Sequence, residues 1–242
     1  MNFKKFLNEY QHRNPVDGEG DEVFKNAVKI AKTHCVQALN NSACKIYRGT
    51  HSGSEHPYEI LHGEAGERAS ANTTNHYTVI LDHVLGKRGY PKRSASIICS
   101  TDEGKAEQYG TVYRILPFDN VVIGICPTFD IFHTSVDLDG STKPIYQWND
   151  IFDDWNISDS SWEDFLESAV KSKMPEFRGK TKQEIETMIT LGYAVKSGFN
   201  TTKPWQMTKF PKSDRELWIG GKCLAIREDK FEIFMDAVND NV

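Results

Sequence analysis

The sequence predicts an α+β fold, and three observations lead to this prediction. Short runs rich in β-branched residues recur along the chain and are bounded by turn residues or polar pairs. Around them lie longer segments in which apolar residues recur at helical spacing. Near the C-terminus, Gly220-Gly221 interrupts an apolar run, a pattern typical of a strand pair or a bulged strand. We expect a single domain over residues 1–242.

The composition is that of an ordinary protein with a buried core. Apolar residues make up 38% and charged residues 26% of the chain. A formal net charge of −5 argues against a protein that coats DNA, although it leaves a local basic groove open. No apolar run approaches the ~18 residues of a membrane span. The N-terminus MNFKKFLNEY also lacks a hydrophobic signal core, so we expect a cytoplasmic protein without a membrane contact.

Cysteine and histidine usage indicates neither a disulfide framework nor a metal site. The five cysteines are odd in number and widely spaced, without a Cys-x-x-Cys pair. This pattern is typical of reduced thiols in a cytoplasm. The eight histidines form no His-Glu-x-x-His motif and no tight Cys-His set, so we expect no metal.

The N-terminal residues 1–40 have a helical pattern with one break. Asn14-Pro15 and the glycine-containing run Asp17–Gly20 interrupt it. Asp21 is then expected to cap a helix whose apolar residues form one face. That face should pack on the rest of the domain.

A short strand is expected at residues 44–49, and residues 50–66 are predicted to be a polar loop. Because side chains alternate along a strand, Ile46 and Arg48 share one face of it. An arginine at a strand end can reach into a cleft. A solvent-exposed arginine is the common alternative.

The next helix is predicted from Thr74 to Leu85, and Gly86 closes it. A basic cluster follows, made of Lys87, Arg88, Lys92 and Arg93. Such a cluster is usually solvated surface. Because this one borders the central stretch of the sequence, contact with phosphate or nucleic acid is the alternative.

The central stretch, residues 91–117, has the pattern strand, helix, strand, over residues 96–100, 101–109 and 111–116. Ser100 and Thr101 stand where the first of these strands ends. A hydroxyl group there can accept an amide hydrogen bond, and the acids Asp102 and Glu103 suit the positive end of the helix. Helix capping alone can therefore explain why Ser100 and Thr101 stand at this position.

The rest of the chain is predicted to contain one buried strand, several helices and a closing strand pair. The expected order is a strand at 121–126, irregular or short helical structure at 128–160, helices at 161–173 and 181–196, a loop at 198–212, strands over 215–226 and a helix at 230–238. Thr181-Lys182-Gln183-Glu184 matches a capping box, which marks the start of its helix.

Three polar groups that are far apart in the sequence lie at predicted strand ends. They are Tyr47-Arg48-Gly49, Ser100-Thr101 and Asp214-Arg215-Glu216. In this order they make the sequence resemble the ADP-ribosyltransferase superfamily, in its arginine, serine and glutamate class. That class carries an Arg on the first core strand, a Ser-Thr-Ser-like motif on the second and a Glu on a later strand. The resemblance covers about residues 45–126 and 205–230.

The resemblance implies a split mixed β-sandwich with an N-terminal helical segment, residues 1–40, and a helical insertion, residues 128–200. The insertion accounts for a separation between Ser100 and Glu216 that is long for the family. Two motif positions depart from the family pattern. Asp102 replaces the last serine, and Asp214 stands where Glu or Gln is usual, which leaves the acceptor specificity open.

The resemblance also implies a mono-ADP-ribosyltransferase with NAD as its substrate and a protein or nucleic acid as its acceptor. Cleavage of the bond between nicotinamide and ribose builds positive charge on the ribose. Glu216 is implied as the carboxylate that stabilises this charge. Arg48 would pair with the dinucleotide phosphates, and Ser100 would orient Glu216.

Other residues are implied in supporting roles. Asp214 shares a strand face with Glu216 and would orient or deprotonate the acceptor. Thr101 would shape the strand end, and Tyr109 or Tyr113 would stack on nicotinamide. Further ligands of the dinucleotide would be Gly49, Thr50, Arg68, Ser70 and Asn72.

The loop that holds Trp205 and Phe210 lies where members of the family recognise the acceptor of ADP-ribose. Members of the family are often phage-encoded or toxin-like effectors that act in a host cytoplasm, so an antitoxin or inhibitor is a further implied partner.

Two other functions remain open. A non-catalytic module on the same fold would bind protein, or nucleic acid through the basic cluster. An NAD glycohydrolase, or a related phosphate-removing enzyme, would use water or a 2′-phosphate in place of the acceptor. Taken singly, Arg48 is explained as a surface charge and Glu216 as part of a solvated strand entry. The enzyme hypothesis requires both to meet Ser100 around one dinucleotide-sized pocket.

Overall fold

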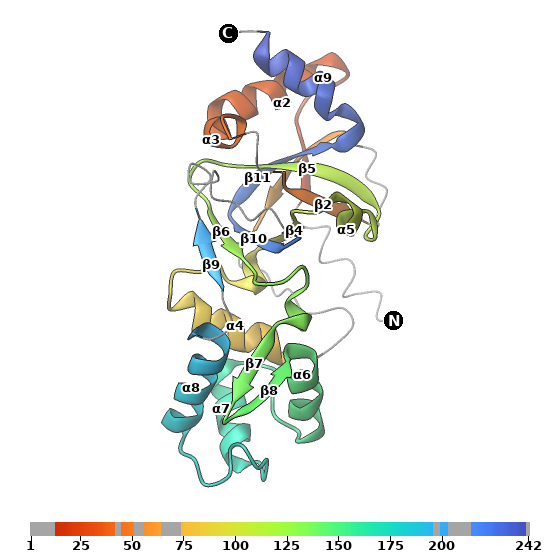
Figure 1. The fold of residues 1–242 in the computed structure, drawn as a ribbon. Helices are drawn as coiled ribbons and strands as arrows, with labels where there is room; N and C mark the ends of the chain where they lie inside the picture. The colour runs from red at the N-terminus through yellow and green to blue at the C-terminus, as the bar shows by residue number, and fades with distance from the viewer. Residues whose placement is uncertain are drawn as a thin grey trace.

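The computed structural model describes residues 13–41, 45–50, 56–63, 74–195, 199–202 and 214–240, and over these ranges the chain has an α+β fold (Figure 1). Nine strands form one sheet in the order β1-β3-β11-β5-β2-β4-β10-β6-β9. They are β1 (Arg13–Pro15), β2 (Tyr47–Thr50), β3 (Tyr58–His62), β4 (Ile97–Ser100), β5 (Thr111–Pro117), β6 (Val122–Ile125), β9 (Asn200–Thr202), β10 (Glu216–Gly220) and β11 (Lys222–Arg227).

Every pairing between the described strands of this sheet is antiparallel, whereas the family resemblance led us to expect a mixed sheet. A parallel pair needs a crossover connection. Here β10 and β11 are joined by the single residue Gly221, whose φ is +134°. The predicted break at Gly220-Gly221 is confirmed, but the strands on either side of it do not pair with each other, since β10 pairs with β4 and β6 and β11 pairs with β3 and β5 of the same sheet.

Both faces of the sheet are apolar, which explains the nearly continuous apolar runs in the sequence. In β10, Leu217 and Ile219 belong to an inner core, while Trp218 belongs to a second core below the sheet. In β11, Cys223 and Ala225 join the inner core, while Leu224 and Ile226 join a third core. Residues from both halves of the sheet meet in the inner core, so the sheet curves around it.

Helices cover the outer face of the sheet at its two ends (Figure 1). At one end lie α2 (Asp21–His34), α3 (Val36–Leu39) and α9 (Glu228–Asn239), and at the other α4 (His76–Gly86), α6 (Ile145–Asp154), α7 (Trp162–Lys171) and α8 (Lys182–Thr190). The second group is accompanied by a hairpin of β7 (Ser135–Leu138) and β8 (Ser141–Pro144). We call α4, α6–α8 and this hairpin the lower module. The predicted helical segment at 128–200 therefore also contains strands.

The sheet is nearly divided between β2 and β4. These two strands share the one residue pair Tyr47 and Ser100, whereas β2 pairs with β5 along its whole length. The short helix α5 (Glu103–Glu107) packs on β2 beside this division. A Cβ atom at Gly49 would lie 1.8 Å from the carbonyl oxygen of Ala106, so this close approach of helix and strand requires a glycine.

Four predictions about individual elements are wrong, and one of them is the loop at 198–212, which contains β9. The segment predicted as a polar loop at 50–66 contains β3, whose Leu61 is buried in the inner core. The segment at 128–160 contains the β7–β8 hairpin as well as the expected short helices. Asp21 is the first residue of α2 and not its N-cap, a position that Gly20 takes with a φ of +54°. The capping box of Thr181 and Glu184 is confirmed.

Candidate functional site

The strands that carry the three motif groups are neighbours in the sheet. The order β2-β4-β10 places the strands of Arg48, Ser100 and Glu216 side by side, although long segments separate them in the sequence. Ser100 and Glu216 are directly opposite each other. Side chains of such a pair lie on one face with Cβ atoms about 5 Å apart. The structure therefore brings the predicted hydroxyl and carboxylate together.

Arg48 lies next to this pair but points to the other face. The residue opposite Ser100 on β2 is Tyr47, and Arg48 is instead opposite Tyr113 of the inner core. The Arg48 side chain is half-buried, and its guanidinium donates a hydrogen bond of 2.6 Å to the carbonyl of Ile98. Because this position is one residue beyond the last bridge between β2 and β4, Arg48 stands where the sheet divides.

The carboxylate of Glu216 is almost fully buried, with 7% of the residue exposed. One oxygen, Oε1, accepts a hydrogen bond of 2.7 Å from the indole Nε1 of Trp218. The other, Oε2, accepts one of 3.0 Å from the backbone N–H of Ile131. The guanidinium of Arg93 lies 3.7 Å from Oε1. Two hydrogen bonds and one ion pair thus fix the orientation of this carboxylate.

Arg93 is part of the site and not of a surface cluster. It is buried, and its guanidinium lies over the rings of Tyr77 and Trp218, at 4.8 and 5.9 Å from their centroids. Burial alone lowers the pKa of Arg93, but Tyr77, Glu216, Cys126 and Asp82 together outweigh it and raise that pKa. The prediction of a four-residue basic surface cluster is therefore wrong at Arg93, because its position above β10 gives it a buried partner.

Ser100 and Thr101 fasten the end of β4 to its neighbours. The Ser100 hydroxyl accepts a hydrogen bond of 3.0 Å from the N–H of Asp102, and Asp102 itself is the N-cap of α5. The Thr101 hydroxyl accepts one of 2.9 Å from the N–H of Arg215, whose carbonyl accepts the N–H of Thr101. The N-cap of α5 is thus Asp102, the residue that differs from the family's Ser-Thr-Ser motif. Thr101 binds the residue before β10 and so holds that strand in place.

Asp214 lies at the edge of the site, just before β10. Burial, and to a smaller extent the charge of Asp102, raise the pKa of Asp214, while Lys105 and Arg215 oppose this. Its buried Oδ1 has no hydrogen-bond partner among the described residues. A carboxylate oxygen without a hydrogen-bond partner can receive a donor from a ligand that reaches it.

The remaining predicted ligands have mixed outcomes. Thr50 is buried at the end of β2, and over the described ranges its hydroxyl has no hydrogen-bond partner. Tyr109 is 59% exposed after α5, where a ligand can reach its ring. Tyr113 is buried in the inner core, and its hydroxyl donates to the carbonyl of His56, so it cannot stack on nicotinamide. The residues outside the described ranges are Arg68, Ser70, Asn72, Trp205 and Phe210.

Sequence reasoning missed three of the groups that contact Glu216. Trp218 stands two positions after it, so strand alternation alone places the two on one face. No comparable signal marks Arg93, which comes from the segment before β4, or the backbone N–H of Ile131, which comes from the 3₁₀ turn η3 (Ile131–His133). Such contacts depend on how distant segments pack.

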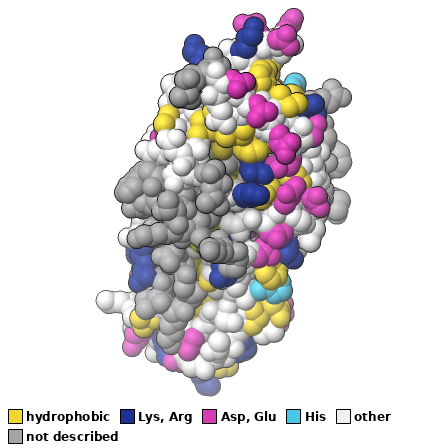
Figure 2. Space-filling model, turned by 45° about the horizontal axis from the view of Figure 1, so that its top comes forward, with side chains coloured by type: hydrophobic (Ala, Val, Ile, Leu, Met, Phe, Trp, Pro, Cys, Tyr) yellow, Lys and Arg dark blue, Asp and Glu magenta, His cyan; other side chains and the backbone are white. Residues whose placement is uncertain are grey.

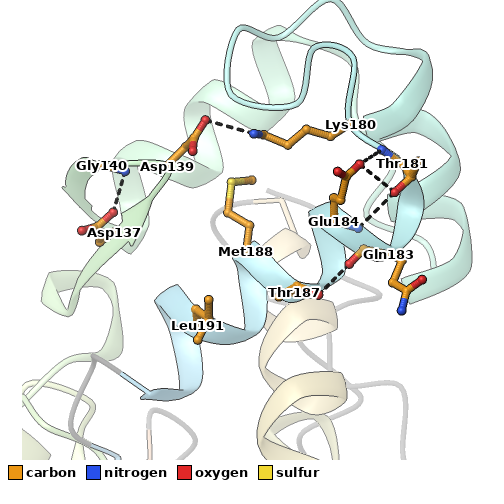
Figure 3. Close-up of a pocket in the computed structure, with 10 residues that line it drawn as sticks. All are labelled: Asp137, Asp139, Gly140, Lys180, Thr181, Gln183, Glu184, Thr187, Met188 and Leu191. Carbon is orange, nitrogen blue, oxygen red and sulfur yellow. Dashed lines mark hydrogen bonds and ion pairs between the residues drawn. The ribbon is translucent and has the colours of Figure 1, made fainter.

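A pocket of about 770 Å³ lies away from these residues, between the β7–β8 turn and α8 (Figure 3). Lys180 reaches across it to Asp139 at 3.2 Å, and Thr181 and Glu184 are joined in the capping box. The charged side chains of Lys180, Asp139 and Glu184 therefore already have partners within the protein. The described residues that line this pocket include neither Ser100 nor Glu216.

Comparison with known proteins adds no family. No protein-family model, curated protein or solved structure matches this chain. Among the described residues, none of the helices has the length and apolar character needed to cross a membrane.

Proposed function

We propose that this protein is a mono-ADP-ribosyltransferase that cleaves the nicotinamide–ribose bond of NAD and transfers ADP-ribose to a macromolecule. One observation carries the proposal. The strands of Arg48, Ser100 and Glu216 are adjacent in the order β2-β4-β10, and Ser100 is directly opposite Glu216. This order brings together strands that long segments separate in the sequence, and it places Ser100 and Glu216 on one face of the sheet, whereas Arg48 points to the other face.

Glu216 supplies the negative charge that the reaction needs. As nicotinamide leaves, positive charge develops on the ribose, and a carboxylate fixed beside that sugar lowers the barrier. The hydrogen bonds from Trp218 and Ile131 hold the carboxylate in one orientation before the substrate arrives. A preorganised charge of this kind acts without reorganisation during the reaction.

Arg48, Thr50 and Asp214 supply binding and transfer. The division between β2 and β4 gives the Arg48 guanidinium a position from which it can exchange the Ile98 carbonyl for a phosphate oxygen. The Thr50 hydroxyl lies two residues further along the same strand. Asp214, whose Oδ1 has no hydrogen-bond partner among the described residues, would receive the N–H or O–H of the acceptor and take its proton.

A second candidate is a non-catalytic binding module on the same fold. The observation that favours it is that the polar groups of Glu216 and Arg48 already bind other parts of the protein. Both oxygens of Glu216 accept hydrogen bonds from the protein, and the Arg48 guanidinium is bound to a backbone carbonyl. In this hypothesis, Glu216 and Arg93 form a structural pair that joins the sheet to the lower module.

Incubation with labelled NAD and a cell lysate distinguishes the candidates. Parallel samples are treated with protease or nuclease, and the series is repeated with Glu216→Ala. We expect transferred label that one of the two treatments removes and that Glu216→Ala abolishes. Release of nicotinamide without transfer would identify a glycohydrolase. The absence of both reactions in a folded protein would favour the binding module.

A further inference from the structure

A row of exposed ring side chains lies on the surface beside the candidate site. Phe129 is 43% exposed, Tyr146 is 40% exposed, and His133 between them is also exposed. The His133 ring centroid lies 5.3 Å from that of Phe129 and 5.9 Å from that of Tyr146. At the other end, the ammonium group of Lys105 lies 4.5 Å above the Phe129 ring. We call Phe129, His133 and Tyr146 the aromatic row.

The aromatic row is attached directly to the proposed catalytic strand. The backbone N–H of Glu216 donates to the carbonyl of Thr128, the residue before Phe129. The backbone N–H of Ile131, between Phe129 and His133, donates to the carboxylate of Glu216. A molecule bound to the row would therefore lie on the segment whose backbone holds the carboxylate of Glu216.

The exposure of this row has no structural explanation within the described part of the chain. A single exposed apolar residue is normal, but adjacent exposed rings leave a large apolar area in water. Aromatic side chains of this kind are enriched at the centres of protein interfaces, where they contribute much of the binding energy. The row therefore has the character of an interaction surface.

Charges beside the row indicate which partner fits it. Burial, and to a smaller extent the charge of the neighbouring Asp102, raise the pKa of Asp214, whose buried Oδ1 has no hydrogen-bond partner among the described residues. The nearby cations are already engaged, since Lys105 lies on Phe129 and the Arg215 guanidinium donates to the carbonyl of Pro127. Figure 2 shows a face on which hydrophobic side chains flank a histidine, with both acidic and basic side chains close to them. A positively charged group on the partner would complement this edge.

We propose that the aromatic row binds a protein that presents an apolar side chain to the rings and a basic side chain to Asp102 and Asp214. The identification of this protein as the ADP-ribose acceptor rests on the proposed function, whereas the binding itself does not. Nucleic acid fits the surface less well for two reasons. Its phosphates would face the two carboxylates, and the rings are inclined by 31° and 66° to their neighbours, so they offer no parallel faces for successive bases.

Binding is tested with fluorescent probes and the full-length protein. The probes are a peptide of alternating arginine and leucine, the same peptide with glutamate in place of arginine, and an oligothymidine. The double variant Phe129→Ala/Tyr146→Ala is compared with Trp155→Ala, which removes an aromatic ring of 40% exposure at the far end of α6. We expect the basic peptide to bind best, and its affinity to fall about tenfold or more in the double variant alone.

Equal affinity of the double variant and Trp155→Ala for the basic peptide would overturn the proposal, as would a preference for oligothymidine or the acidic peptide, or no binding of any probe.

The acceptor role is tested separately with labelled NAD and lysate. The quantity measured is label transferred to protease-sensitive material per nicotinamide released. This ratio should fall in the double variant and stay at its wild-type value in Trp155→Ala. An unchanged ratio in the double variant would refute the acceptor role. If the wild-type protein releases no nicotinamide at all, the proposed function fails, and the peptide measurements still decide whether the row binds a basic partner.

Discussion

Glu216 is a buried charge, and its surroundings are those that a buried charge requires. An ionised carboxylate out of water is costly unless donors and a counter-charge replace the solvent. Trp218, Ile131 and Arg93 supply these from β10, η3 and the segment before β4. The same contacts that stabilise the fold therefore set the position of the group that we propose as catalytic.

The hydrogen bond from Trp218 should be worth more than an ordinary one. Trp148 is a matched control, because it is also fully buried and its Nε1 donates to a neutral acceptor, the carbonyl of Val136, at 3.0 Å. Phenylalanine at either position removes the donor and a similar volume. We expect Trp218→Phe to lower the free energy of unfolding by roughly 1 kcal/mol more than Trp148→Phe, because hydrogen bonds to charged groups are the stronger ones. Urea denaturation measures both, and equal losses would contradict this expectation.

Asp214 should reduce stability at neutral pH. Its raised pKa means that the folded protein disfavours the ionised form, so the penalty is complete above that pKa. The penalty disappears below about pH 3.9, the usual value of an exposed aspartate, where the group is protonated in both states. We therefore expect Asp214→Asn to melt at a higher temperature than the wild type at pH 7, with a difference that vanishes in acid. A difference that grew as the pH fell would refute this cause.

For single residues, the sequence predicted that Ser100 lies beside Glu216 on one face of the sheet. It missed the neighbours of Glu216 that come from other segments of the chain. The pairing of Ser100 with Glu216 follows from ordered motifs on strands. The direction of Arg48 does not, because it depends on whether Tyr47 or Arg48 is opposite Ser100, and one residue of register reverses the face. Arg93 was assigned to the surface because a run of basic residues carries no sign of which member is buried.

Among the elements, α5 shows how a single position controls the site. It caps itself with Asp102, follows Ser100-Thr101 directly and packs against Gly49 of β2. Any outward shift of this helix would move the end of β4, and with it the hydroxyl opposite Glu216. The close packing at Gly49 is therefore a requirement of the site as well as of the sheet.

Two glycine substitutions near α5 should act in opposite directions. Gly49→Ala places a Cβ atom 1.8 Å from the Ala106 carbonyl oxygen, and we expect it to cost about 1–3 kcal/mol through overpacking. At Gly104, inside α5, an added Cβ meets Asp102 at 3.4 Å, an ordinary contact. Gly104→Ala should therefore stabilise the protein by up to about 1 kcal/mol through helix propensity. Destabilisation of equal size at both positions would contradict the proposed packing.

Most elements could be predicted from local pattern, and the missed ones have identifiable reasons. The capping box at Thr181 and the break at Gly220-Gly221 are local signals that the structure confirms, although β10 and β11 do not pair with each other. Asp139-Gly140, both with positive φ, is a strong signal for the β7–β8 turn, but each strand has only four residues and β8 has no large apolar side chain, so local pattern does not predict the hairpin. For β3 the reason is its brevity: five residues inside a polar segment give too little alternation.

On the scale of the whole molecule, the lower module and the sheet share one core. Trp218 of β10 packs in the same cluster as Trp148 of α6 and Trp162 of α7. The buried pair of Arg93 and Glu216 lies at this junction. The module is therefore not an independent appendage, and its removal would expose the outer face of the central strands.

This shared core predicts a single cooperative unfolding transition. Tryptophan fluorescence reports on the module and β10 together, while far-ultraviolet circular dichroism reports on all helices and strands. We expect the two signals to give the same midpoint in urea, as for a two-state domain. Loss of helical signal at lower urea, before the fluorescence of Trp218 changes, would show that the module unfolds by itself.

The adjacency of β2, β4 and β10 is the feature on which the proposed function depends, and no local pattern in the sequence contains it. The resemblance to a family supplied the order of the motifs, and the sheet then joins them across long loops. Its most direct test is the rate of nicotinamide release from NAD by the wild type, by Glu216→Gln and by Glu59→Gln. Glu59, on β3, is an equally buried glutamate outside the site.

We predict that the wild-type protein releases nicotinamide, that Glu216→Gln slows this by about a hundredfold or more, and that Glu59→Gln retains the wild-type rate. Equal rates in the wild type and Glu216→Gln, or no release by the folded wild-type protein, would contradict the account.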